Sequence, residues 1–451
     1  MELIYTILIT LFSLALLVTV HEFGHFWVAR RCGVTVLRFS VGFGRPLLTW
    51  HDRHGTEYVI AMLPLGGYVK MLDERVEEVT PGAEDGAFNR KSVWARIAIV
   101  AAGPAANLIL AVVAYWFVFI AGETGIAPII GKVEADSVAA VAGLETGQEI
   151  VAIDGRATPT WQAVNFRLLD RIGDSGPLHF SVRYPDSDLV YQSTATLQNW
   201  LADSEQPNLV AGLGIQVMRP PIPVILDEIV ADSPAAAAGL RSGDRVFAAD
   251  GQLMPEWQQW VEYVRARPGT EMLLEYERDG VAAQALLIPA RKQSDDGTTY
   301  GQVGVTVKVP EWPPEMVREF HYGPWSALVA ATTRTGDLVI FTLNSIKKML
   351  TGLISTKNLS GPITIAKVAT ASAESGLESF IAFLALLSVS LGVINLLPVP
   401  VLDGGHLLFY SLEALFGRPV PEKLQVVGYQ VGLSIIMGVM VLALYNDITR
   451  L

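Results

Sequence analysis

A His-Glu-x-x-His sequence, His21-Glu22-Phe23-Gly24-His25, stands at the end of the first apolar stretch. Residues i and i+4 of a helix share one face, so both imidazoles can reach one metal ion while Glu22 points at a water molecule beside it. Polar residues at a membrane boundary are the structural alternative, but ionisable groups there are costly unless they are partnered. The pattern therefore predicts one Zn2+ per chain, held by His21 and His25, with Glu22 as general base.

A catalytic zinc needs a third protein ligand and an open position for water. Asn395, Pro398, Pro400 and Asp403 stand in one segment at the end of a long uncharged run. Asp403 is the predicted third ligand, and His406, three residues later, is the alternative. The two prolines should interrupt their own helix and leave free backbone groups beside the metal.

Four uncharged runs are long enough to cross a bilayer, which takes about 20 apolar residues. Only 17% of the residues are charged, and the mean hydropathy is +0.37. The first run lacks the basic start and the cleavage site of a signal peptide, so we expect it to be retained. The sequence thus predicts a multi-pass α-helical membrane protein with four transmembrane helices, within 1–33, 97–122, 379–410 and 424–446.

Lysine and arginine indicate the orientation of these helices. None precedes Arg30, and ten lie between Arg30 and Arg96. Since cytoplasmic loops carry the excess of basic residues, the loop within 34–96 is expected in the cytoplasm, and both termini and the long middle region outside it. The first and third helices then end on the same side, where His25 and Asp403 can meet.

Composition argues against nucleic-acid binding and against structures built on cysteine. The net charge of −12 argues against a nucleic-acid partner, because neutralising phosphates needs a basic surface. The single cysteine, Cys32, cannot form an intrachain disulfide or a thiolate metal site.

The middle region contains an internal repeat. Residues 135–144 match 231–240, Asp154-Gly155 matches Asp250-Gly251, and Trp161 matches Trp257, every pair 96 residues apart. A constant offset predicts two copies of one small domain, within 123–220 and 221–310.

Each copy resembles a PDZ domain, an α+β fold, in its small residues, Ala-Gly-Leu and closing Asp-Gly. The resemblance to permuted bacterial PDZ domains implies peptide-binding loops at Gly212, Leu213, Gly214 and Ile215 and at Val303, Gly304 and Val305. An edge strand there could accept an extended peptide as an added strand. Rigid spacers without a ligand are the open alternative.

Two regions remain. Within 34–96, residues 36–44 and 57–71 are predicted strands of a membrane-associated β-sheet, with Gly42-Phe43-Gly44 as a turn. Within 311–378, residues 324–350 are predicted to form an interfacial amphipathic helix with a break near Gly336. Ordinary packing of this helix on the second repeat is the alternative.

The paired His-Glu-x-x-His and Asn-x-x-Pro-x-Pro-x-x-Asp-Gly sequences resemble those of the site-2 proteases, which are intramembrane zinc metalloproteases of family M50. The resemblance implies that His21, His25 and Asp403 bind zinc and that Glu22 is the base. It also implies that Asn395, Pro398 and Pro400 contact the substrate. Gly42, Phe43 and Gly44 would belong to a membrane-dipping sheet that holds an unwound substrate as a strand.

The full layout resembles the members of this family that serve the sigma-E stress response of Gram-negative bacteria. It implies a protein of the inner membrane that cuts single-span substrates, such as an anti-sigma factor after a first external cut, with remnant signal peptides as a second class. The PDZ-like pair would act as an external size gate. A membrane scaffold or ion carrier with a non-hydrolytic metal site is the alternative, which leaves Glu22 without a role.

Overall fold

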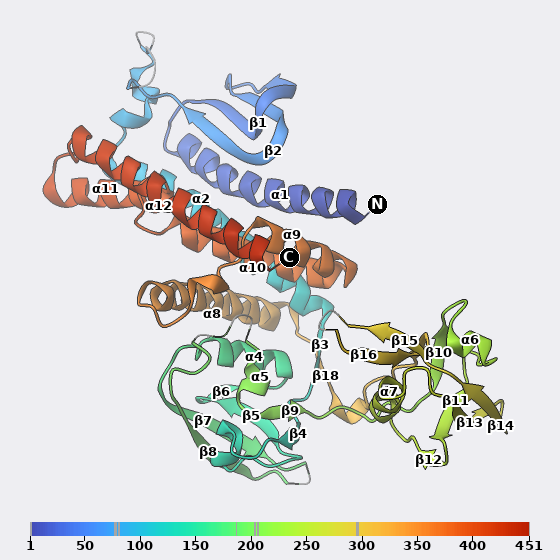
Figure 1. The fold of residues 1–451 in the computed structure, drawn as a ribbon. Coiled ribbons are helices and arrows are strands. Elements are labelled where there is room, and N and C mark those ends of the chain that lie inside the picture. Colours follow the sequence, from blue (N-terminus) through green and yellow to red (C-terminus); the bar gives the residue numbers. More distant parts are fainter. Residues whose placement is uncertain are drawn as a thin grey trace.

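The computed structural model describes residues 2–75, 79, 82–185, 187–202, 204, 207–294 and 297–450. Four of its helices are long and apolar enough to cross a membrane, one in each predicted segment. They are α1 (Glu2–Arg31), α2 (Val93–Ala121), α10 (Leu377–Asn395) and α12 (Glu422–Thr449). These helices lie together on one side of the molecule, and the residues of the internal repeat lie on the other (Figure 1).

The third predicted segment, 379–410, is not one continuous helix. Helix α10 ends at Asn395, and a new helix, α11 (Asp403–Phe416), begins eight residues later. Pro398 and Pro400 lie in the break, where their missing N–H groups cannot continue a helical ladder. A further short helix, α9 (Pro362–Glu374), precedes α10 and was not foreseen.

The region after α1 is a curled antiparallel sheet of β1 (Val36–His51) and β2 (Glu57–Met71). Each strand folds back on itself, so that Val41 pairs with both Gly67 and Ile60. Gly42 and Gly44 have φ of +92° and +86°, values that favour glycine, and they bend β1 at this point. The predicted sheet is present, and its insertion into the membrane stays a prediction.

The internal repeat is a structural repeat. The first copy, repeat 1, contains β4 (Ile130–Val133), α3 (Val138–Val141), β5 (Glu149–Ile153), β6 (Arg156–Ala157), α4 (Trp161–Leu169), β7 (Gly176–Arg183), β8 (Val190–Leu197), α5 (Leu209–Gly212) and β9 (Ile215–Val217). The second, repeat 2, contains β10 (Leu226–Ile229), α6 (Pro234–Ala237), β11 (Arg245–Ala249), β12 (Gln252–Leu253), α7 (Trp257–Arg265), β13 (Met272–Arg278), β14 (Val281–Leu287), β15 (Ala290–Gln293), β16 (Thr299–Gln302) and β17 (Val305–Val307). The first six elements of the two copies start 96 residues apart, as the sequence offset predicts.

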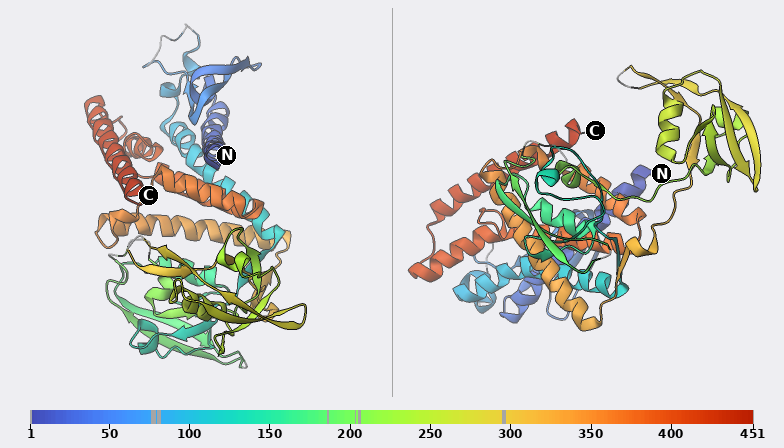
Figure 2. Two further views of the ribbon diagram at one scale, coloured as in Figure 1. Left: turned by 45° about the vertical axis from the view of Figure 1, so that its right-hand side comes forward. Right: turned by 90° about the horizontal axis from the view of Figure 1, so that it is seen from below.

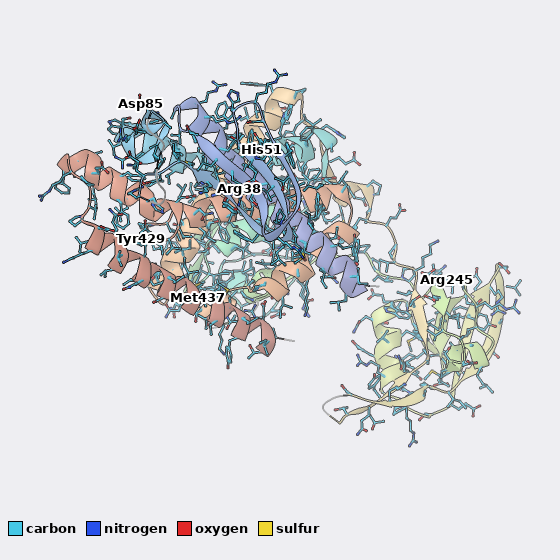
Figure 3. The ribbon with its side chains drawn as sticks, turned by 90° about the horizontal axis from the view of Figure 1, so that it is seen from above. Arg38, His51, Asp85, Arg245, Tyr429 and Met437 are labelled. Atoms are coloured by element: carbon cyan, nitrogen blue, oxygen red, sulfur yellow. The ribbon has the colours of Figure 1, made fainter. Side chains whose placement is uncertain are left out.

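Each repeat has its own antiparallel sheets and its own core. The sheet orders are β6-β5-β7-β8 with the pair β4-β9 in repeat 1, and β12-β11-β13-β14 with the pairs β10-β17 and β15-β16 in repeat 2. Phe180 and Trp260 are among the largest fully buried side chains of the two cores. Repeat 2, marked by Arg245, lies apart from the helices (Figure 2, right; Figure 3).

Both repeats are inserted between two paired strands. β3 (Glu123–Ile126) follows α2, and β18 (Val317–Phe320) follows repeat 2. The two strands pair antiparallel, with Ile126 opposite Val317, so the chain leaves the helices and returns to them at one place.

Helix α8 (Pro324–Leu350) follows β18 and lies between the spanning helices and repeat 1 (Figure 1). The predicted break near Gly336 is wrong, because the helix runs through it: a lone glycine costs only about 1 kcal/mol in a helix interior. The alternative of packing on repeat 2 is also wrong. Phe166 of repeat 1 contacts Phe341, and Asp337 accepts a hydrogen bond from Arg167 of repeat 1.

Candidate active site

The three predicted metal ligands converge. His21 and His25 lie one turn apart on α1, with their Nε2 atoms 3.2 Å apart. Asp403, the first residue of α11, places Oδ2 3.0 Å from His21 Nε2 and 3.4 Å from His25 Nε2. Among the described residues this is the group of His, Cys, Asp and Glu that could hold a metal ion. Residues 382 positions apart in the chain thus form one site.

The donor set fits zinc. Ligands at about 2.0–2.1 Å from a tetrahedral Zn2+ lie about 3.4 Å from one another, close to the three distances found here. Asp403 Oδ2 is buried and accepts no hydrogen bond, in spite of its nearness to the imidazoles. His25 Nδ1 lies 2.8 Å from the carbonyl oxygen of Ile99, which only accepts. Nδ1 therefore carries the proton, and the lone pair of Nε2 is left for a metal.

Two glycines allow α1 and α2 to meet at this site. A Cβ on Gly24, the fourth residue of the His-Glu-x-x-His sequence, would lie 2.2 Å from the carbonyl oxygen of Ala102. A Cβ on Gly103 would lie 2.2 Å from His25 Nε2 and 2.8 Å from His21 Nε2. The space in front of the two imidazoles therefore exists because residue 103 has no side chain.

The break before α11 determines the position of Asp403. Val401 has a φ of +118°, which is rare and strained for a β-branched residue. The two glycines after Asp403 allow the first turn of α11 to fold against this loop. A Cβ on Gly404 would lie 2.2 Å from the oxygen of Leu397, and one on Gly405 2.5 Å from Pro400 Cα.

Glu22 lies between the two histidines in sequence and beside β2 in space. It is half-buried, and its Cγ would lie 3.3 Å from a Cβ on Gly67. Its carboxylate faces the backbone N–H of Val69 on the same strand. β2 therefore restricts the rotamers of the predicted base.

The alternative third ligand, His406, does not join the group. Its Nδ1 lies 3.4 Å from the hydroxyl oxygen of Tyr429 on α12, and its ring lies against Tyr410. Cys32, after the end of α1, also lies outside the group and packs against the apolar cluster that contains Phe26 and Val34.

The other predicted substrate-contacting residues lie around the break and in the sheet. Asn395 is the last residue of α10 and is half-buried, Pro398 is exposed, and Pro400 lies against α12, where a Cβ on Gly432 would meet its carbonyl oxygen. Phe43 is exposed at the bend of β1 and stacks on Tyr68, with ring centroids 6.1 Å apart.

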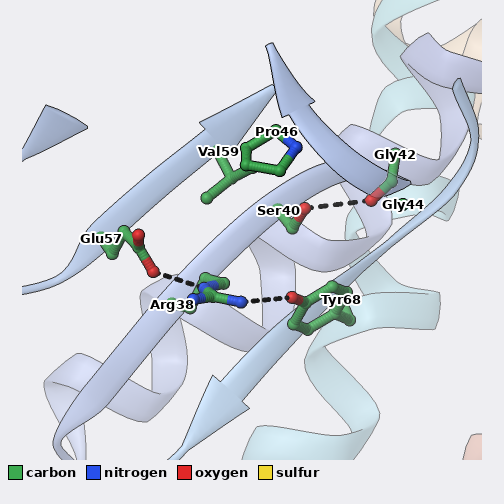
Figure 4. A pocket seen from close by; sticks show the side chains of 8 residues that line it. All are labelled: Arg38, Ser40, Gly42, Gly44, Pro46, Glu57, Val59 and Tyr68. Atoms are coloured by element: carbon green, nitrogen blue, oxygen red, sulfur yellow. Dashed lines mark hydrogen bonds and ion pairs between the residues drawn. The ribbon is translucent and has the colours of Figure 1, made fainter. Parts of the chain in front are cut away.

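Gly42 and Gly44 line a cavity of about 60 Å³ in the sheet (Figure 4). There Arg38 pairs with Glu57 and donates to the Tyr68 hydroxyl, so the cavity is a polar pocket inside an apolar sheet.

The predicted peptide-binding loops occupy equivalent places in the two repeats. Gly214 and Gly304 have φ of +79° and +75°, and each backbone oxygen accepts from an N–H of its own repeat, Glu134 and Val230. Leu213, Ile215 and Val303 are buried in the repeat cores, and Val305 is half-buried. Strands β9 and β17, which follow these loops, each pair on one side only within the described residues.

Sequence reasoning missed the face of α2 that lies against the predicted metal ligands. Ile99, Gly103 and Asn107 recur every fourth residue and so share one side of that helix. Asn107 is fully buried, and its amide nitrogen lies 3.2 Å from His21 Nδ1. A polar amide inside an uncharged run of 26 residues was a detectable signal, because polar groups within spans usually have a function.

Comparison with known proteins gives one family model, two relatives over nearly the whole chain and one solved structure of a single domain. The model of Peptidase family M50 matches residues 9–439. The regulator of sigma-E protease RseP of Escherichia coli (strain K12) is 47% identical over 439 residues, covering 97% of each chain. A Vibrio cholerae protein named "Putative zinc metalloprotease" is 42% identical over 450 residues, covering 100% of each chain. A PDZ domain of an SdrC-like protein from Listeria monocytogenes is 22% identical and covers 20% of this chain and 92% of its own, with a TM-score of 0.16.

Proposed function

Because this chain belongs to peptidase family M50 and is thus a zinc metalloendopeptidase, we propose that it cleaves single-span membrane proteins within or beside the membrane. One Zn2+ per chain would be held by His21, His25 and Asp403. The observation that carries the proposal is the convergence of these three ligand atoms within 4.8 Å of one another, next to Glu22.

The chain's residues account for peptide-bond hydrolysis. When bound, zinc would act as a Lewis acid that polarises a carbonyl and makes water more acidic. Glu22 takes a proton from the attacking water as the C–O bond forms, and delivers it to the leaving nitrogen as the C–N bond breaks. Ile99 holds His25 in the tautomer that offers Nε2. Asn395, Pro398 and Pro400 border the break beside Asp403, where an unwound substrate segment could lie.

The direct test is cleavage of a single-span reporter in detergent by the native chain and by Glu22→Gln. We expect cleavage by the native chain and none by the variant, with the same zinc content in both. Equal cleavage by the two proteins would remove Glu22 from the mechanism. Membership of a peptidase family does not favour the scaffold or ion-carrier alternative. A zinc-loaded native chain that cleaves nothing would nevertheless return that alternative to consideration.

The name of the Escherichia coli relative, regulator of sigma-E protease, suggests the substrate class. We propose an anti-sigma factor of the inner membrane, already shortened by a first external cut, as the natural substrate, and remnant signal peptides as a second class. The basic residues between Arg30 and Arg96 favour a cytoplasmic position for the sheet and the metal centre. Both termini and the repeats would then be periplasmic.

The two PDZ-like repeats would act as a size gate, and peptide addition to β9 or β17 is a second use. Because β3 and β18 pair, a chain without residues 128–308 can be closed by a short linker. We expect the variant without residues 128–308 to cleave a substrate that still carries its external domain. If that substrate stays intact while the shortened one is cut, the gate is refuted.

A further inference from the structure

The structure points to Asn107 as the residue that sets the tautomer and ring orientation of His21, and we propose that it tunes zinc affinity without touching the metal. This inference rests on the proposed metal site. The side chain is 0% exposed, inside the spanning helix α2. Among the described residues, its amide oxygen has no hydrogen-bond partner. A buried acceptor without a donor is costly, so this oxygen requires an explanation.

The imidazole of His21 supplies the missing donor. If Nε2 of a neutral imidazole binds a metal, Nδ1 must carry the proton and needs an acceptor. The Asn107 amide is the group beside that atom, 3.2 Å away. A half-turn of the amide exchanges its nitrogen and oxygen, which places the orphaned oxygen on His21 Nδ1–H.

A neighbouring hydrogen bond engages the backbone of Asn107 and not its side-chain amide. Ser388 of α10, also fully buried, donates a hydrogen bond of 2.8 Å to the backbone oxygen of Asn107. One face of α2 thus contacts both histidines. The Ile99 carbonyl oxygen accepts a hydrogen bond from His25, and the Asn107 amide would accept one from His21. Gly103, between them, has no side chain that could occupy the space in front of the two imidazoles. A hydrogen bond to the second nitrogen of a metal-binding histidine typically changes metal affinity about 10- to 100-fold.

The test is zinc affinity, measured by competition with a chelator on the full chain in detergent. Asn107→Leu keeps the size but removes the acceptor, and we expect its affinity to fall about 10- to 100-fold. Asn107→Asp keeps an acceptor and should remain within about threefold of the native chain. Ser388→Ala is the matched control, because it removes the neighbouring bond but not the amide, and its affinity should be unchanged.

The comparison separates positioning from packing. If Asn107 only fills space, the leucine variant should bind zinc as the native chain does and the aspartate variant should bind worse, since it buries a charge. Either result overturns the inference. If Asn107→Leu does not fold, Asn107→Ala against Asn107→Asp gives the same contrast. A native chain that binds no zinc would refute the metal site itself, whereas native affinity in Asn107→Leu would refute only the role of Asn107.

Discussion

Gly103 gives a sharp test of the metal centre, because a single methyl group there should close it. In Gly103→Ala the new Cβ would lie 2.2 Å from His25 Nε2 and 2.8 Å from His21 Nε2. Non-bonded carbon contacts are comfortable at about 3.5 Å, so the imidazole of His25 or the backbone of α2 must move by about 1.3 Å. Metal ligands keep their distances within about 0.2 Å. We therefore expect zinc affinity to fall at least about 100-fold.

The stability cost should be modest by comparison. Inserting a methyl group into a packed interior costs about 1–3 kcal/mol, so the variant should still fold. Gly438→Ala is the matched control, since it lies in the spanning helix α12 and its Cβ would meet nothing within 4 Å. Zinc affinity by chelator competition and unfolding in the presence of chelator would be measured on all three chains. Native zinc affinity in Gly103→Ala would refute the placement of the metal in front of this residue.

Three further predictions follow from single contacts. Asp447 of α12 accepts hydrogen bonds from the backbone N–H groups of the first turn of α9, so Asp447→Ala should destabilise the chain by about 3 kcal/mol or more, read from thermal unfolding in detergent. Asp337→Ala on α8 removes the acceptor of Arg156 and Arg167 of repeat 1 and should cost only about 1 kcal/mol. It should also increase cleavage of substrate with an intact external domain if the proposed gate needs repeat 1 to be attached to α8, and unchanged cleavage would contradict that attachment as part of the gate. Burial opposes the charge on Asp52, but hydrogen bonds from Arg30 and two backbone N–H groups hold its pKa at about 2. Its stabilising effect should be complete above pH 4 and be lost as the pH falls toward 2, and Asp52→Ala should abolish that part of the pH dependence of unfolding.

The sequence was sufficient to select the three residues that the structure brings together as the candidate metal site. His21, His25 and Asp403 belong to two short motifs. The presence of both motifs in one chain makes a chance match of either one improbable. The constant offset of 96 residues predicted the repeated elements because both copies fold by local pattern. The helix 324–350 showed the limit of such local reasoning. Gly336 predicted a break there, but the contact of α8 with Phe166 is a tertiary one that no local pattern contains.

Helix α2 shows why the rest of the site could not be predicted. Apart from Asn107, its uncharged run is apolar on all sides, so no periodicity identifies which face meets α1, and Gly103 looks like any small residue in a membrane helix. Its role becomes visible only when the pairing of α1 with α2 is known. α2 contributes no ligand, but Ile99 and Asn107 contact the far nitrogens of both histidines.

A consequence follows for how this centre responds to substitution. α1 carries the histidines, yet Phe23 and Trp27 on its outer side are about half exposed, at 51% and 49%, and reach no part of the site. Changes to alanine there should alter contact with lipid and leave zinc affinity within about threefold, because these side chains leave α1 on the face opposite the two histidines. Changes at Gly103 and Asn107 on α2 should lower it by an order of magnitude or more. Ile99 accepts through its backbone oxygen, which a change of side chain keeps. A scan in which the outer face of α1 mattered as much as this face of α2 would mean that the geometry of the centre is set within α1 alone.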